Sequence, residues 1–79
     1  MYYAVVDVVA LEDFIVRLTF RNGVRKQFDM KPYLNKGIFK ELQDPDKFRS
    51  VRVCFDTIEW ENEADFDPEV LYSEGIEIR

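Results

Sequence analysis

The feature that most constrains the fold is an alternating run of residues that ends in an Asn-Gly pair. Apolar side chains alternate with mostly polar ones here, the apolar ones being Phe14, Val16, Leu18 and Phe20 and the others Ile15, Arg17, Thr19 and Arg21. A period of two is typical of a strand with one buried face, so we predict that the even-numbered residues point inward. The Asn22-Gly23 pair that follows predicts a hairpin to a further strand at residues 24–28.

The length of the hairpin loop decides which side chains share a face. A two-residue loop at Asn22-Gly23 pairs Phe20 with Arg25 and mixes the apolar row with polar side chains. A three-residue loop pairs Phe20 with Val24 instead, and it puts Gly23 at the left-handed position of a type I turn with a G1 bulge. We therefore predict the bulged hairpin.

Lys26 does not fit the inner face that this register defines. The bulged hairpin pairs Val16 with Phe28, and Lys26 points to the same side as these two residues. A lysine has a long aliphatic stem, so we expect this one to extend its ammonium group into water at a sheet edge.

The rest of the chain predicts short strands and short helices. Residues 2–11 are apolar except for Asp7, which predicts a strand whose inward face stays undecided, and a turn at 12–13 follows. Apolar spacing predicts a helix at 37–43, and the pairs Asp44-Pro45 and Asp67-Pro68 predict capped helical turns, the second ending at Gly75. Strands at 51–55 and 58–60 form a second hairpin, while residues 76–79 either add an edge strand or lie loose.

Seventy-nine residues predict a single domain over 1–79. An apolar fraction of 47% with 34% charged residues is typical of a soluble globular chain. We predict an α+β fold: an antiparallel three-stranded meander plus a second hairpin, with two or three short helices. The predicted core contains the one tryptophan and most phenylalanines, namely Trp60, Phe14, Phe20, Phe28, Phe39, Phe48 and Phe55.

Several classes of activity are disfavoured by residues that the chain lacks. It has no histidine, so histidine-based nucleophile pairs and histidine zinc sites are excluded. Its single cysteine, Cys54, forms no intrachain disulfide, which indicates a reducing, cytoplasmic compartment. No apolar stretch is long enough to span a membrane, and the N-terminus lacks the pattern of a signal peptide. We expect no enzyme, no cofactor, no metal and no membrane association.

The order of short motifs resembles a known family. The run 14–23 followed by Asp29-x-x-Pro32-x-Leu34 is similar to the opening of the bacterial domain-of-unknown-function family 2442. The similarity continues through the segments 37–42 and 44–48, then Ile58-x-Trp60, and closes with 65–72. Family members commonly have Pro and Gly after the tryptophan, where this chain has Glu61 and Glu63, so the shape of that turn is open.

What the resemblance implies is an α+β fold without a known activity, cofactor or catalytic residue to transfer. Some members of the family are fused to a helix-turn-helix domain, and others stand alone beside small partner genes. The resemblance therefore also implies an antitoxin-like role as one alternative. We expect no helix-turn-helix within these 79 residues.

Charge is divided unevenly along the chain and gives a first candidate surface. Residues 1–53 carry ten basic against seven acidic residues, whereas residues 54–79 carry one against nine. Acidic residues occupy every second position from 61 to 69: Glu61, Glu63, Asp65, Asp67 and Glu69. The run does not fit an EF-hand calcium loop, and Asp67 is explained as a helix cap. We expect Glu63 and Asp65 to be solvated or to meet a basic protein partner.

A second candidate surface is the outer face of the first hairpin. The bulged register places Arg17 and Arg25 there, with Arg21 at the tip. Arg49 and Arg52 extend this patch if the strand at 51–55 lies nearby. Phosphate contact is conceivable for such arginines, but interleaved aromatics are missing. The simpler alternative is a polar face paired with Glu59 and Glu61 across the sheet.

The leading hypothesis is a non-enzymatic protein-interaction module that binds a protein partner and is able to form a homodimer. The first strand supports it, since its two faces are almost equally apolar and Tyr2-Tyr3 could belong to an exposed edge. The alternative is a toxin–antitoxin-type regulatory module that contacts nucleic acid directly or through a partner, although nucleic acid is the less favoured ligand. An enzyme with paired carboxylates is the third alternative.

Overall fold

Four antiparallel strands form the main sheet, in the order β1-β2-β3-β6. The computed structural model describes residues 3–78, and the strands are β1 (Val5–Leu11), β2 (Ile15–Phe20), β3 (Arg25–Asp29) and β6 (Ile76–Glu77). The α+β prediction is confirmed. The meander β1-β2-β3 is present, but the sheet has four strands rather than three, because residues 76–77 pair with β3 as an edge strand.

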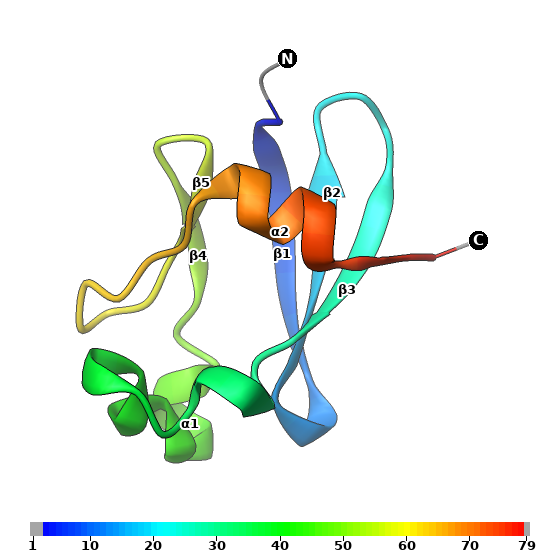
Figure 1. Cartoon of the computed structure of the whole chain (residues 1–79). Helices are drawn as coiled ribbons and strands as arrows, with labels where there is room; N and C mark the ends of the chain where they lie inside the picture. Colours follow the sequence, from blue (N-terminus) through cyan, green and yellow to red (C-terminus); the bar gives the residue numbers. More distant parts are fainter. Residues whose placement is uncertain (1–2, 79) are drawn as a thin grey trace.

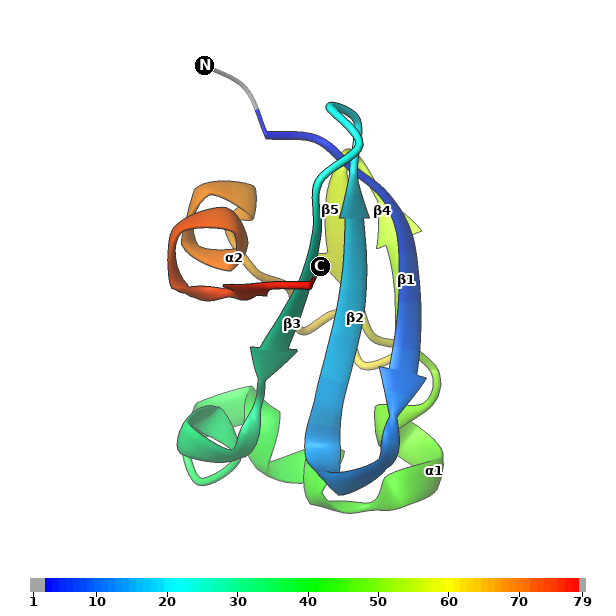
Figure 2. The same ribbon diagram turned by 90° about the vertical axis from the view of Figure 1, so that its right-hand side faces the viewer.

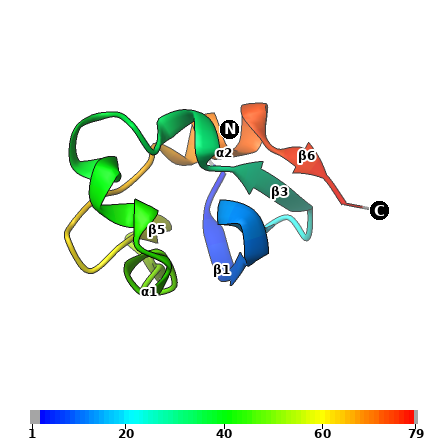
Figure 3. The ribbon, with the colours of Figure 1, turned by 90° about the horizontal axis from the view of Figure 1, so that it is seen from below.

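The remaining elements gather on one side of this sheet. A separate hairpin of β4 (Arg52–Cys54) and β5 (Thr57–Glu59) and the helix α2 (Pro68–Glu74) lie on that side (Figure 1). Seen from below, the helical segments η2 (Lys31–Tyr33), η3 (Gly37–Gln43) and α1 (Pro45–Phe48) lie on the same side (Figure 3). Figure 2 shows β1, β2 and β3 with no helix in front of them.

The predicted register of the β2–β3 hairpin is confirmed. Val16 pairs with Phe28, and the Phe20 backbone N–H donates to the Val24 carbonyl at 2.9 Å. Gly23 has a φ of 87°, as the left-handed position of a G1 bulge requires. Val16, Leu18 and Phe20 are buried, so the even-numbered face points inward as predicted.

The turn between β1 and β2 is one residue longer than predicted. Leu11 pairs with Ile15, so the turn is η1 (Glu12–Phe14) and Phe14 precedes the strand instead of opening it. Asp13 and Phe14 both have positive φ, 64° and 59°. Lys31 joins this turn to η2, because its ammonium group donates to the Asp13 carbonyl and carboxylate at 2.9 and 3.0 Å.

Pairing with β2 decides the inward face of β1. Val8 and Ala10 lie opposite the buried Leu18 and Val16, whereas Val9 and Leu11 point to the other face of the sheet. A bulge between Val5 and Asp7 leaves Val6 49% exposed. Of the predicted exposed tyrosine pair, Tyr3 is half-buried and stacks on Tyr72, and Tyr2 lies outside the described residues.

The two predicted caps are formed. Asp44 accepts from the Asp46 backbone N–H and Asp67 from that of Glu69, both at 2.9 Å. The caps begin α1 and α2, each with a proline in its first turn. The helix predicted at 37–43 is present as the 3-10 helix η3.

Trp60 is fully buried at the centre of the core, as predicted. Its indole N–H donates to the Phe48 carbonyl at 2.8 Å, so its polar atom is satisfied inside the core. Phe20, Phe28 and Phe48 are also buried, and Phe14 and Phe39 pack against the core while half-buried.

Phe55 was expected in the core, and that prediction is wrong. The side chain is 93% exposed because strand β4 ends at Cys54, which pairs with Thr57, and leaves Phe55-Asp56 as a two-residue turn. Both turn residues have positive φ, 49° and 67°, as a type I′ hairpin turn requires. The alternation of Val51, Val53 and Phe55 therefore does not mark an inward face.

Candidate functional site

The side of the main sheet that carries no helix forms a continuous face of apolar and charged residues of both signs, here called the outer sheet face. One row of paired residues crosses all four strands: Val9, Arg17, Gln27 and Ile76. The flanking rows are Asp7, Thr19 and Arg25 on one side, and Leu11, Ile15 and Asp29 on the other. Adjacent rows are two residues apart along each strand, so their side chains are neighbours.

The apolar residues of the outer sheet face lie apart from the core. Val9, Leu11 and Ile15 are half-buried by their neighbours, yet they do not pack against the core cluster. Ile76, at the other edge, is 76% exposed. An apolar group of this kind on a sheet face that no helix covers is typical of an interaction surface.

Arg17 and Arg25 lie on this face as predicted, on diagonally adjacent positions of β2 and β3. Among the described residues, no ion pair involves either of them. Arg17 is half-buried between Val9 and Gln27, whereas Arg25 is exposed. A guanidinium group forms bidentate hydrogen bonds with carboxylates and phosphates, so each of these arginines can bind an anionic group on a partner.

The other predicted basic residues lie elsewhere. Arg21 is at the hairpin tip, where it pairs with Asp56 at 3.5 Å. Arg49 pairs with Asp46 on α1, so it does not extend the patch as predicted. Arg52 does not extend it either, since it pairs with Glu59 at 2.8 Å on the separate hairpin. The predicted pairing of Glu59 with the outer sheet face is therefore wrong as well.

Glu63 and Asp65 do not lie on the outer sheet face. They belong to the segment after β5, on the left in Figure 1, whereas the outer sheet face lies on the right. Both side chains are exposed, and Asp65 forms an isolated bridge with Glu59. No group of three or more potential ligand residues suited to a metal ion occurs within residues 3–78.

The turn that holds Glu63 has the same geometry as the β2–β3 turn. The Trp60 N–H donates to the Ala64 carbonyl and the Glu63 N–H to the Trp60 carbonyl, both at 2.9 Å. In both turns an asparagine side chain, Asn62 or Asn22, accepts from the backbone two residues later at 3.1 Å. Glu63 takes the position of Gly23, with a φ of 71°. The segment with Glu61 and Glu63 therefore forms the same bulged turn as the segment with Gly23.

Three titratable groups have raised pKa values. Hydrogen bonding to Asp13 is the main cause that raises the pKa of Lys31, with Asp29 adding to it. Burial raises the pKa of Tyr33, and Glu74 adds to the effect. Burial also raises the pKa of the Cys54 thiol, with Glu59 adding to the shift and Arg52 opposing it. A thiol with a raised pKa is a poor nucleophile at neutral pH, which fits a structural role for Cys54.

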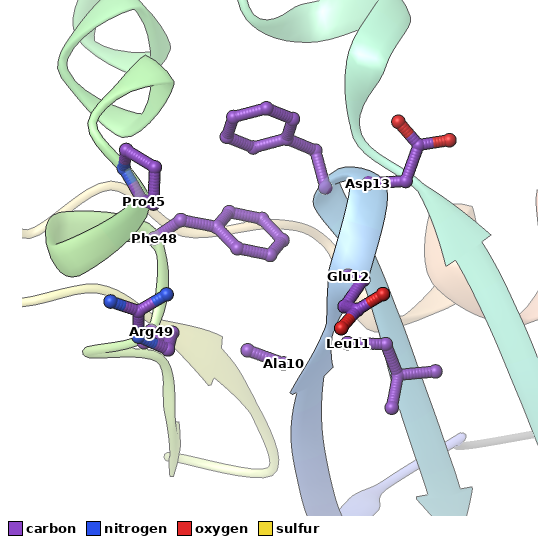
Figure 4. A pocket seen from close by; sticks show the side chains of 8 residues that line it. Ala10, Leu11, Glu12, Asp13, Pro45, Phe48 and Arg49 are labelled. Atoms are coloured by element: carbon purple, nitrogen blue, oxygen red, sulfur yellow. The ribbon is translucent and has the colours of Figure 1, made fainter.

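A cavity that the sequence did not predict lies between the β1–β2 turn and α1. Its volume is about 460 Å³. Figure 4 shows the residues that line it, which are Ala10, Leu11, Glu12, Asp13, Phe14, Pro45, Phe48 and Arg49. The rings of Phe14 and Phe48 meet edge to face at 5.3 Å on its lining, which also includes the charged residues Glu12, Asp13 and Arg49.

No helix within residues 3–78 is long and apolar enough to cross a membrane.

Comparison with known proteins places the chain in a family. Neither the curated proteins nor the solved structures contain a significant match. The model of the family described as Protein of unknown function (DUF2442) matches residues 5–77, nearly the whole chain and the region that builds both sheets. The chain therefore belongs to the DUF2442 family.

Proposed function

We propose that the protein is a non-enzymatic protein-interaction module that binds its partner on the outer sheet face. One observation supports this proposal: a sheet face that no helix covers carries two kinds of residue that a partner could bind. Its apolar residues lie outside the core, and its two arginines have no ion-pair partner among the described residues. A partner would remove the apolar groups from water and supply anions to Arg17 and Arg25, which form no ion pair within residues 3–78.

The chemistry of the face favours a protein segment that is both acidic and apolar. Carboxylates opposite Arg17 and Arg25 would form charge-assisted hydrogen bonds, while Val9 and Ile15 would pack on aliphatic side chains. Asp7 and Asp29 lie on the same face, so an acidic partner has to place its carboxylates opposite the arginines and away from these two residues. The protein's overall charge of −5 also adds long-range repulsion toward polyanions.

Charge reversal on the outer sheet face tests the proposal. Partners are captured with the tagged protein from its native host and identified by mass spectrometry, and binding of the purified partner is then measured. The double variant Arg17→Glu with Arg25→Glu is expected to weaken binding at least tenfold. The matched control, Lys40→Glu with Lys47→Glu, makes the same change in net charge away from this face and should bind normally.

Equal binding of the partner by both double variants would count against the proposal. So would partner binding that survives Ile15→Asp combined with the two arginine reversals. Circular dichroism and Trp60 fluorescence report whether each variant is folded, since Trp60 is the one tryptophan and is fully buried. The sites tested are on the solvent side of β2 and β3, so the inner core is unchanged.

A second candidate function is a toxin–antitoxin-type regulatory module that contacts nucleic acid. The observation that favours it is that Arg17 and Arg25 share one face and form no ion pair in the described part of the chain, because guanidinium groups also match phosphate oxygens. None of the described residues paired on this face is aromatic, so bases have no ring there on which to stack, and a protein partner is the better proposal. Nucleic acid is tested by gel shift at low salt, where absence of binding excludes direct contact.

We also propose that the protein works in a bacterial cytoplasm. The lone Cys54, which lies in a strand and has a raised pKa, is compatible with a reducing compartment. A fluorescent fusion expressed in the native host tests the location, and a membrane or periplasmic signal would contradict it.

A further inference from the structure

Strand β1 is the longer of the two edge strands of the main sheet (Figure 2). It has seven residues, whereas β6 at the opposite edge has two. Natural edge strands are commonly protected against further pairing by lysine, by proline or by a bulge. Residues 5–11 include no lysine and no proline, and the bulge between Val5 and Asp7 ends before Val8. The part of β1 from Val8 to Leu11 is therefore a regular edge without these protections.

The hydrogen bonds of β2 alternate between its two neighbours in the sheet. The Phe20 N–H donates to the Val24 carbonyl on the β3 side, at 2.9 Å. The Arg21 N–H donates instead to the Ala4 carbonyl on the β1 side, at 2.8 Å. In an antiparallel sheet this alternation continues along the strand, so even-numbered residues of β2 bond to β3 and odd-numbered ones bond to β1.

This alternation leaves four main-chain groups of β1 without a partner in the sheet. Val9 and Leu11 lie opposite odd-numbered residues of β2, so their N–H and C=O groups bond to that strand. The N–H and C=O groups of Val8 and Ala10 point the other way, out of the sheet edge. Within residues 3–78 no other segment bonds to these groups. An extended chain matches two donors and two acceptors in this pattern, because it pairs as an additional strand.

Two carboxylates flank this edge. Asp7 directly precedes Val8, Glu12 directly follows Leu11, and both acidic residues are exposed. Neither forms an ion pair in the described part of the chain. Antiparallel pairing with β1 of a second copy would bring Asp7 of each copy toward Glu12 of the other, which disfavours that occupant. A strand with a basic residue at each end would place a cation near each carboxylate.

The cavity beside α1 offers space for one side chain of such a strand. A residue that pairs opposite Ala10 points to the same side of the sheet as Ala10 does. Ala10 lines the cavity of about 460 Å³ together with Phe14, Pro45 and Phe48 (Figure 4). The position opposite Ala10 therefore favours an apolar residue.

We propose that β1 binds an extended segment of a partner protein as an additional strand. The segment is short and apolar, with a basic residue at each end for Asp7 and Glu12 and an apolar residue opposite Ala10. Main-chain pairing supplies the affinity, and the carboxylates and the cavity supply the selectivity. The contact lies at the sheet edge and uses neither Arg17 nor Arg25, so it does not depend on the binding proposed for the outer sheet face.

Synthetic peptides of about seven residues test the inference with the full chain. The lysine probe alternates valine and threonine between two terminal lysines, and the glutamate probe has glutamates at its ends instead. The methylated probe keeps the side chains and charges of the lysine probe but is methylated on its internal main-chain nitrogens, so it cannot donate hydrogen bonds. Fluorescence anisotropy should show that the glutamate and methylated probes bind at least tenfold more weakly than the lysine probe.

Amide hydrogen exchange locates the contact on the protein. In the free protein, the outward N–H groups of Val8 and Ala10 should exchange faster than the N–H groups of Val9 and Leu11, which bond to β2. Saturation with the lysine probe should slow exchange at Val8 and Ala10 at least tenfold, an effect that attraction between charges alone does not produce. Protection of these two amides that rises with protein concentration, without any probe, would indicate a second copy and overturn the inference.

Two variants of the protein complete the test. Ala10→Pro removes one outward donor and keeps the bonds to β2, because proline is tolerated where the N–H of an edge strand faces solvent. It should weaken binding of the lysine probe at least tenfold. Asp7→Lys with Glu12→Lys should reverse the preference in favour of the glutamate probe. The matched control, Glu63→Lys with Asp65→Lys, makes the same change in net charge away from β1 and should still prefer the lysine probe.

Trp60 fluorescence reports whether each variant is folded, and the methylated probe tests main-chain pairing on the unaltered chain if Ala10→Pro does not fold. Equal binding of the lysine and methylated probes would overturn the inference. So would unchanged exchange at Val8 and Ala10, or a lysine probe that does not bind at about 1 mM. Arg17→Glu with Arg25→Glu should still bind the lysine probe, so failure of this inference is distinguishable from failure of the proposed function.

Discussion

The ammonium group of Lys26 lies 4.0 Å from the centroid of the Tyr72 ring and donates to the Tyr72 backbone carbonyl. This contact joins β3 to the last turns of α2, whose carbonyl ends favour a cation. Tyr72 in turn stacks on Tyr3 at 4.0 Å and meets Phe20 edge to face at 4.9 Å. Lys26 therefore does not extend into water at a sheet edge as the sequence predicts: α2 and β6 cover it.

Replacing Lys26 with methionine should lower the free energy of unfolding by about 1–2 kcal/mol. The aliphatic stem would remain, but the charge-assisted hydrogen bond and the cation–π contact would be lost. Urea denaturation followed by Trp60 fluorescence measures the change. Lys36→Met is the control, because Lys36 is exposed and lies 5.5 Å from the Tyr33 ring centroid. Equal effects of the two variants would contradict the role assigned to Lys26.

Local patterns predicted those parts of the fold that neighbouring residues determine. The bulged β2–β3 hairpin follows from alternation and one glycine, and the caps of α1 and α2 follow from aspartate-proline pairs. The positions of Lys26 and Phe55 were predicted wrongly, for two different reasons. Lys26 is covered by a helix 46 residues later in the chain. Phe55 was misplaced because alternation does not reveal that a short strand ends early.

The candidate site was predictable only in part, for the same reason. The register of one hairpin places Arg17 and Arg25 on a common face. It does not show that Val9 and Leu11 join them, because β1 is apolar on both faces and only its pairing with β2 decides the matter. The cavity combines a turn with a helix more than thirty residues away, and no local pattern encodes that contact.

Glu63→Gly should stabilise the protein by about 0.5–1 kcal/mol. Glycine removes the cost of a left-handed conformation, about 1–2 kcal/mol, and part of this gain is offset by its greater freedom in the unfolded chain. The matched turn supplies the reverse experiment: Gly23→Ala, at a φ of 87°, should destabilise by about 1 kcal/mol. Thermal denaturation of both variants measures the changes, and a lower melting temperature for Glu63→Gly would refute the turn geometry.

Gly75→Ala should destabilise the protein by about 1–3 kcal/mol, although its φ is an ordinary −70°. The reason is space: an added Cβ would lie 2.7 Å from the Leu71 carbonyl oxygen and 3.1 Å from the Lys26 Cβ. The backbone would have to move where α2 ends and β6 begins. Gly37→Ala separates space from backbone strain, because Gly37 has open surroundings and a φ of 50°. Hydrogen exchange at β6 should accelerate in Gly75→Ala alone.

The stability of the protein should fall as the solution becomes alkaline. Lys31, Tyr33 and Cys54 all have pKa values raised in the folded state, by hydrogen bonding to Asp13 in the first case and chiefly by burial in the other two. A raised pKa means that the folded chain holds the proton more tightly than the unfolded chain. The contribution of each group is therefore complete below its unfolded pKa and is lost as the pH rises through the folded pKa.

The decline should begin with Cys54, near the unfolded thiol value of about 8.5, and steepen as Tyr33 and Lys31 titrate above about 10. Urea denaturation at several pH values between about 7 and 11 measures it. Cys54→Ser should remove the earliest part of the decline and leave the later part, and Lys31→Gln should flatten the later part. A free energy of unfolding that stays constant or rises across this interval would contradict the inferred proton linkage, because every cited shift has the same sign.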